Sequence, residues 1–202
     1  MKNPFDFHIN TVIEDDTEPK IPLSPMQEES LLSFVKSDKV YYKYYDELII
    51  LLGTGLRISE FCGLTDRDID FENRTLNVDH QLQYSGKKSY RVETPKTDNG
   101  IRKIPMSDCV LEALQRVMQN KKSSDFTVDG YIGFLFLTRN GTPKMCSSYD
   151  AMFRRLVEKY NKNHEEALPA VTTPHTLRHT FCTNMANAGM NPKALQYLMG
   201  HA

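Results

Sequence analysis

The chain has 202 residues, enough for one ordinary domain with a substantial core and a short arm. Its net charge is −1 at pH 7, so overall charge alone does not indicate a nucleic-acid partner. The longest apolar run, Leu48 to Leu52, is far shorter than the roughly 20 residues that span a bilayer, and no charged-then-apolar leader opens the chain. We therefore expect a soluble protein without a membrane partner.

The cysteines, at positions 62, 109, 146 and 182, lie far apart and form no C-x-x-C pair. This spacing indicates neither a zinc ribbon nor a disulfide framework. A reducing cytoplasm is therefore the expected location.

The charge is distributed unevenly. Residues 1–19 contain five acidic side chains against one lysine, which leaves a net charge of about +3 on the remainder. A basic segment between Gly86 and Lys103 contains Lys87, Lys88, Arg91, Lys96, Arg102 and Lys103. Such a segment suits phosphate contacts, although a solvated hairpin has the same composition.

The N-terminal third predicts an arm followed by helices. Residues 1–23 contain three prolines and no sustained period, which favours an extended arm or interdomain linker. Ser24 as N-cap, with proline next and Gln27 as the capping-box partner, predicts a helix to about residue 37. A second helix is expected over 41–52. A short helix from near residue 58 to 62 places Arg57 at a turn-to-helix junction.

The middle of the chain has the alternation of a small antiparallel sheet. A strand is expected over 75–78, and segments 90–94 and 102–105 are expected to form a hairpin whose loop contains Lys96. The other elements expected here are a helix over 107–120, a short strand over 134–137 and a helix over 147–161.

The last third predicts two capped helices. Thr173 caps the first helix, which Gly189 terminates, and Asn191 begins a second helix that Gly200 ends. At about 100° per residue, several polar side chains of the first helix fall within one arc, and this arc is offset from the apolar face of the helix. This arc carries His175, Arg178, His179 and Cys182.

Two segments far apart in the chain carry the chemistry of interest. TGLRISEF contains Arg57, TPHTLRHTF contains His175 and Arg178, and the chain ends with Gly200, His201 and alanine. Metal-free cleavage of a phosphodiester needs fixed cationic donors around the non-bridging oxygens, and an arginine can bond two of them at once. Taken alone, Arg57 with Glu60 three positions later also suits a surface ion pair.

Together these segments resemble the tyrosine recombinase, or phage integrase, family over residues 24–202, with greatest similarity to integrases of conjugative transposons. The resemblance implies an α+β, mainly helical catalytic domain with a small three-stranded antiparallel sheet. It also implies that Arg57 and Arg178 bind the scissile phosphate, that His175 moves protons and that His201 donates a hydrogen bond.

The resemblance further implies a general-acid lysine on a β-hairpin. We assign Lys96, with Lys87, Lys88 and Lys103 as competitors because the hairpin register is open. Glu60 is expected to support Arg57, and His179 to pack or hydrogen-bond. The side chains expected to contact DNA are Lys87, Lys88, Arg91, Arg102 and Lys103.

In this family the nucleophile is a tyrosine roughly ten residues beyond the glycine–histidine pair, whereas this chain stops at Ala202. We therefore expect the fragment to bind DNA without cleaving it. The intact parent is expected to recombine double-stranded DNA through a 3′-phosphotyrosine, as a tetramer on two duplexes. No metal, nucleotide cofactor or small-molecule substrate is expected, because ester exchange conserves the bond energy.

Several alternatives stay open at this point. A substitute nucleophile at Tyr197 is disfavoured, since its helix predicts a packing residue. A zinc site at His175, His179 and His201 lacks the glutamate of H-E-x-x-H. A DNA-binding module without catalysis is the more serious alternative. A type IB topoisomerase is a weaker alternative, because its usual pattern lacks the H-x-x-R-H motif.

Overall fold

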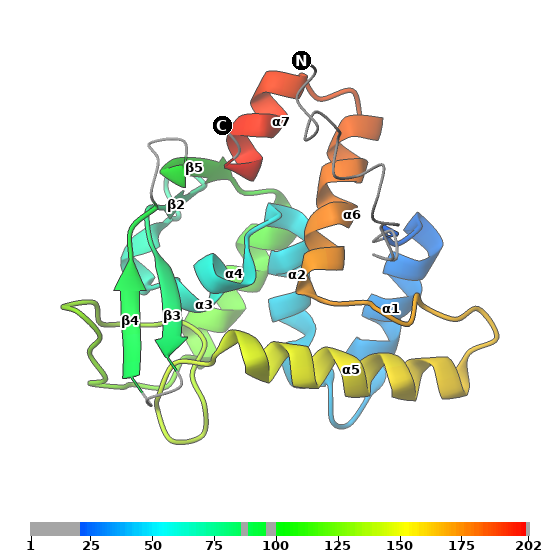
Figure 1. Cartoon of the computed structure of the whole chain (residues 1–202), viewed down its shortest axis with the longest axis horizontal. Helices are drawn as coiled ribbons and strands as arrows, with labels where there is room; N and C mark the ends of the chain where they lie inside the picture. Colours follow the sequence, from blue (N-terminus) through cyan, green and yellow to red (C-terminus); the bar gives the residue numbers. More distant parts are fainter. Residues whose placement is uncertain (1–20, 86–88, 96–99, 201–202) are drawn as a thin grey trace, which may run out of the picture.

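The computed structural model describes residues 21–85, 89–95 and 100–200. Within these ranges the chain is mainly helical with two small antiparallel sheets, which confirms the predicted fold class (Figure 1). The expected arm at 1–23 lies almost entirely outside the described residues. None of the described helices is long and apolar enough to cross a membrane.

The N-terminal helices lie close to their predicted positions. Helix α1 (Pro25–Ser37) has the expected capping box, with the Ser24 side chain and Gln27 bonding each other's backbone amides. The expected second helix starts as a 3-10 turn, η2 (Tyr42–Tyr44), and continues as α2 (Tyr45–Thr54). Helix α3 (Ile58–Gly63) follows directly, with Arg57 as its N-cap.

The sheet pairing differs from the predicted hairpin. A 3-10 turn, η3 (Asp66–Asp68), leads into β1 (Ile69–Asp70), which pairs with β2 (Thr75–Val78). Strand β2 then pairs with β5 (Arg102–Pro105), and β3 (Gln81–Ser85) forms a separate hairpin with β4 (Ser89–Glu93). The predicted pairing of 90–94 with 102–105 is therefore wrong, because β3 takes the place of the second strand.

The remaining helices complete the domain. Helix α4 (Asp108–Asn120) begins one residue after the predicted start, with Ser107 as its N-cap, and α5 (Cys146–Asn163) begins one residue before the predicted start. Between them, the expected strand at 134–137 forms only isolated bridges. Helices α6 (Pro174–Asn187) and α7 (Pro192–Met199) have the predicted Thr173 and Asn191 caps.

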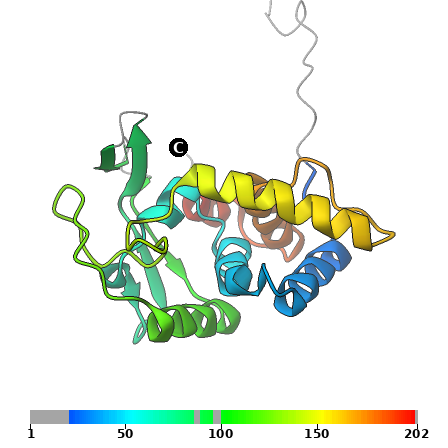
Figure 2. The ribbon, with the colours of Figure 1, turned by 90° about the horizontal axis from the view of Figure 1, so that it is seen from below.

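The core joins these helices to the sheets. Helix α5 lies across the base of α1, α2 and α6, while the strands gather on one side (Figures 1 and 2). Phe61 of α3 stacks on Phe136 with ring centroids 4.0 Å apart and meets Tyr149 of α5 edge-on. These ring contacts hold α3 against α5 and the segment around Phe136, and they therefore fix the turn that carries Arg57.

Candidate active site

Arg57 lies at a turn that glycine makes possible. Gly55 has the left-handed φ of 62°, ends α2 and turns the chain into α3. The backbone amide of Arg57 donates to Glu60 Oε2 over 2.8 Å, and its Nη1 donates to Glu60 Oε1 over 2.9 Å. The ion pair that the sequence suggests is thus present, and it fixes a side chain that is still 39% exposed.

The side chain of Arg178, on α6, reaches the turn that carries Arg57. This side chain is buried, and Nη1 donates to the Gly55 carbonyl over 2.5 Å while Nη2 donates to the Met199 carbonyl. Burial, and then the positive charge of Arg57, lowers the pKa of Arg178 to about 10. The guanidinium remains protonated at neutral pH and is held close to a second cation.

The end of α7 brings the two arginines together. Arg57 Nη2 donates to the Gly200 carbonyl over 3.1 Å, next to the Met199 carbonyl that accepts from Arg178. Gly200 itself has a left-handed φ of 61° and ends the helix. Two guanidinium groups from distant segments therefore converge on adjacent peptide groups.

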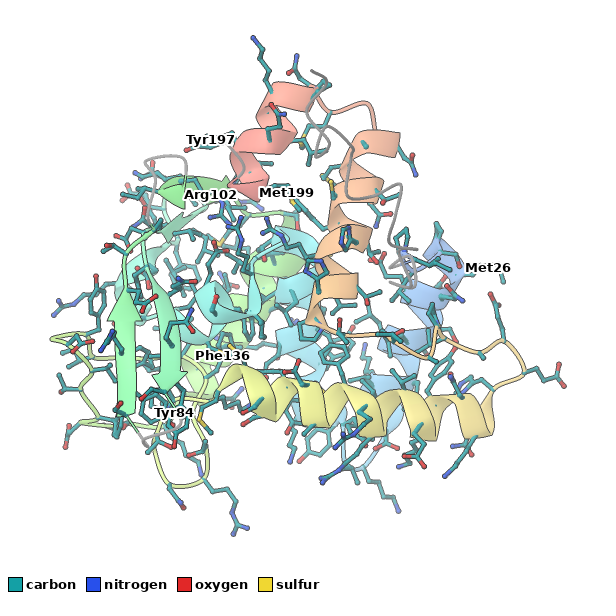
Figure 3. All side chains as sticks on the ribbon, in the orientation of Figure 1. Met26, Tyr84, Arg102, Phe136, Tyr197 and Met199 are labelled. Atoms are coloured by element: carbon teal, nitrogen blue, oxygen red, sulfur yellow. The ribbon has the colours of Figure 1, made fainter. Side chains whose placement is uncertain are left out.

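Arg102 differs from its predicted place on a DNA-binding surface. Its side chain is 0% exposed, because strand alternation in β5 points it inward with Ile104. Nη1 and Nη2 donate to the two carboxylate oxygens of Glu60 over 3.0 and 2.8 Å, and Nε donates to the Leu198 carbonyl over 2.7 Å. The prediction of a phosphate contact by Arg102 is therefore wrong. Figure 3 shows Arg102 at the end of α7, near Met199.

Glu60 is a buried carboxylate between two arginines. Burial alone would raise its pKa, but hydrogen bonds and charge from Arg102, followed by the bonds from Arg57, hold the pKa below its ordinary value. Glu60 is thus ionised at neutral pH. Its contact with Arg57 lies where the sequence predicts it.

The histidines of α6 form a pair one turn apart. His175 is exposed in the first turn, and its Nε2 lies 2.9 Å from Nε2 of His179. The rings meet edge-on with centroids 4.5 Å apart. One imidazole must donate this hydrogen bond and the other accept it, so His179 is placed to set the tautomer of His175.

A cavity of about 200 Å³ opens beside Arg57. Its lining residues are Arg57, Glu60, His80, Gln81, Pro95, Gly100 and Gly200. Pro95 and Gly100 flank Lys96 in the sequence, but Lys96 lies outside the described residues, as do Lys87, Lys88 and His201.

Two other predicted DNA contacts lie on the surface. Arg91 on β4 and Lys103 on β5 are both exposed. The Lys103 backbone amide donates to the Tyr197 hydroxyl over 3.1 Å. Tyr197 is half exposed rather than packed in the core, and its hydroxyl joins α7 to β5. Figure 3 shows it above Arg102.

Within the described ranges, the group with metal-ligand potential is Asp68, Asp79 and His80, whose ligand atoms lie within 4.8 Å of one another. Hydrogen bonds within the protein explain why these three side chains lie close together. The His80 ring nitrogens contact Asp79 Oδ1 at 2.5 Å and the Gly63 carbonyl at 2.8 Å, and Asp68 accepts two bonds from Thr65. This cluster joins the start of β3 to the end of α3.

A mainly helical domain in which two arginines from distant segments converge at the end of one helix is suited to binding a phosphodiester. The chain belongs to the phage integrase family, whose model matches residues 22–202. It is 57% identical to the transposase from transposon Tn916 of Enterococcus faecalis over all of the chain and 50% of the relative. It is also 29% identical to tyrosine recombinase XerA of Pyrococcus horikoshii, over 100% of the chain and 62% of XerA.

Solved structures show the same fold. The Tn1549 transposon integrase in complex with transposon right end DNA matches with a TM-score of 0.94 and 62% identity, over 100% of this chain and 64% of that one. A XerA recombinase structure matches with a TM-score of 0.66 and 25% identity, over 90% of this chain and 56% of that one. The chain thus spans about half the length of the Tn916 transposase and two thirds or less of these two structures.

Proposed function

We propose that the chain is the phosphate-binding part of an integrase catalytic domain that cuts and rejoins DNA through a 3′-phosphotyrosine. The convergence of Arg57 and Arg178 at the end of α7 carries this proposal. Two fixed guanidinium groups can neutralise the charge that builds up on the non-bridging oxygens in the transition state. A tyrosine downstream of residue 202 would supply the nucleophile, so the chain alone would bind DNA without cleaving it.

The proposal includes three further roles. His175, hydrogen-bonded to His179, would pass protons at the phosphate. Lys96 would protonate the leaving 5′ oxygen, a role supported by Pro95 and Gly100, which bracket residues 96–99 in the sequence and line the cavity beside Arg57. His201 follows Gly200, whose carbonyl Arg57 binds, and would donate to the phosphate. Neither a metal nor a nucleotide is required, because one phosphate ester replaces another.

The proposed substrate is double-stranded DNA. The related Tn1549 integrase, 62% identical, is described in complex with transposon right end DNA. Exposed Arg91 and Lys103, together with Lys87 and Lys88, would contact the backbone. The whole protein would act in the cytoplasm as a tetramer on two duplexes during transposition of a mobile element.

A covalent-trapping experiment tests this function. The chain is extended by the segment that follows the corresponding residues in the Tn916 transposase, and is incubated with a nicked suicide duplex of Tn1549 right-end sequence. A denaturation-resistant protein–DNA adduct is expected, and none when the added tyrosine is changed to phenylalanine. Binding without any adduct would instead identify a DNA-binding module without catalysis.

A further inference from the structure

Three arginines bind the last three carbonyl groups at the end of α7. A helix leaves its final carbonyls without intrahelical partners, and they carry the negative end of the helix dipole. Each is satisfied here by a different guanidinium: Leu198 by Arg102, Met199 by Arg178 and Gly200 by Arg57. The proposed phosphate-binding arginines are thus two members of a set of three.

The third member, Arg102, has no access to DNA. Its side chain is 0% exposed, and Nη1 donates to the Gly100 carbonyl over 3.1 Å in addition to its bonds with Glu60 and Leu198. Its fork therefore joins strand β5, helix α3 and helix α7. A lysine could not make these bonds together, because an ammonium group is a single point of charge.

The packing around Gly200 shows how closely these groups are fitted. A Cβ atom at Gly200 would lie 3.0 Å from Arg102 Nη1 and 3.2 Å from Arg57 Nη1. Glycine is therefore needed both for the left-handed turn and for the approach of the two guanidinium groups. A shift of Arg102 would be transmitted to Arg57 through Glu60 and to the segment after α7 through Leu198.

We propose that Arg102 is a positioning residue for DNA strand cleavage: it fixes the position of Glu60, and through Glu60 that of Arg57, relative to the end of α7. This inference rests on the proposed function, since the position of Arg57 relative to the end of α7 matters for a phosphate held by Arg57 and Arg178. The buried charge of Arg102 is compensated by Glu60, so the arrangement places a preformed ion pair directly behind the phosphate site.

The main test compares two substrates in the extended chain. Arg102→Met is assayed on suicide duplexes with either a phosphodiester or a methylphosphonate at the scissile position. A methylphosphonate has a methyl group in place of one non-bridging oxygen and is uncharged, so its cleavage depends less on correctly placed arginines. We expect a loss on the order of 100-fold on the phosphodiester, as for a small misplacement of a catalytic group, and a clearly smaller loss on the methylphosphonate.

Equal losses on both substrates would overturn the proposal, because a merely destabilised protein does not distinguish them. Arg116→Met is the matched control, since Arg116 pairs with Asp46 on another face and should keep unchanged rates. Arg102→Lys keeps the charge without the fork and should give an intermediate loss with the same substrate dependence. Full activity of this variant would also overturn the proposal, and it serves as the test if Arg102→Met does not fold.

A second measurement needs no cleavage and separates this inference from the proposed function. In the 202-residue chain, Arg102→Met should raise the pKa of Glu60 and shift the guanidinium resonance of Arg57 in NMR spectra, while signals of the core near Phe61 and Tyr149 stay in place. An unchanged Arg57 resonance would overturn the positioning role. Absence of an adduct from the unchanged extended chain would refute the proposed function only.

Discussion

The guanidinium of Arg57 and the carbonyl of Gly200 are joined by a hydrogen bond of 3.1 Å, although 143 positions separate them in the chain. One end of the bond is fixed by Glu60, and the other by the left-handed turn that ends α7. The end of α7 is therefore held beside Arg57, an arginine that we propose to bind the scissile phosphate.

Arg57→Lys should impair strand cleavage far more than folding. Lysine keeps the charge but cannot hold Glu60 and a phosphate with a planar fork, so adduct formation by the extended chain should fall roughly 10²- to 10³-fold. The melting temperature should change little, because the Arg57 side chain is 39% exposed. Parallel losses of thermal stability and cleavage rate would indicate a purely structural ion pair instead.

Gly55→Ala should destabilise the domain by roughly 2 kcal/mol or more, since strain and overpacking add. The residue has a φ of 62°, and a Cβ atom would lie 2.4 Å from Cδ1 of Phe181. Gly189→Ala is a matched control, because Gly189 also has a positive φ, of 80°, but open space around its Cβ position. Urea unfolding of both variants measures the difference. Equal losses would mean that backbone strain alone matters at Gly55.

The local elements of this fold are readable from the sequence because caps and glycines define their ends. Ser24, Thr173 and Asn191 begin helices where predicted, and Gly200 ends one. The sheet pairing was not readable. Residues 81–85 show only weak alternation between buried and exposed positions, and pairing of strands depends on contacts that local pattern does not specify.

The site was partly predictable for a related reason. Arg57, Glu60 and Arg178 stand in recognisable motifs, whereas composition alone assigns Arg102 to the basic surface. A signal was present: Arg102 and Ile104 alternate with Lys103 and Pro105, and this period of two places the arginine on the buried face. The backbone acceptors at Leu198, Met199 and Gly200 carry no side-chain signature, so only the fold reveals them.

DNA binding by the 202-residue chain should weaken steeply as salt rises, because phosphate contacts release counterions. Lys103→Gln should weaken binding to all sequences alike and reduce the slope of log K against log salt by about 0.9. Fluorescence anisotropy with a labelled duplex measures both quantities. Lys162→Gln, which removes an exposed partner of Glu158 on α5, is the control and should leave the slope unchanged. A flat salt response of the unchanged chain would speak against phosphate contacts.

Glu60→Gln should remove a stabilisation that depends on pH. Arg102 and Arg57 hold the pKa of Glu60 below its ordinary value, so the folded state favours the carboxylate. For a carboxyl group with a lowered folded-state pKa, the stabilisation is complete above the unfolded-state pKa and is lost as pH falls through the folded-state pKa.

The difference in unfolding free energy between the wild type and Glu60→Gln should therefore be largest near neutral pH. It should be about 3–5 kcal/mol there, since Arg102 would be left as a buried cation without its counterion. It should begin to narrow as pH falls below the ordinary glutamate value of 4.5, where the unfolded state takes up a proton, and should be smallest below the lowered folded-state pKa, where the folded wild-type carboxyl is neutral as well. Urea titrations from pH 7 down to pH 3 measure this, with Glu158→Gln as an exposed ion-pair control that should show little difference. A difference in unfolding free energy that stays constant with pH would mean that the shape of the Glu60 side chain, and not its charge, holds Arg57 and Arg102 in place.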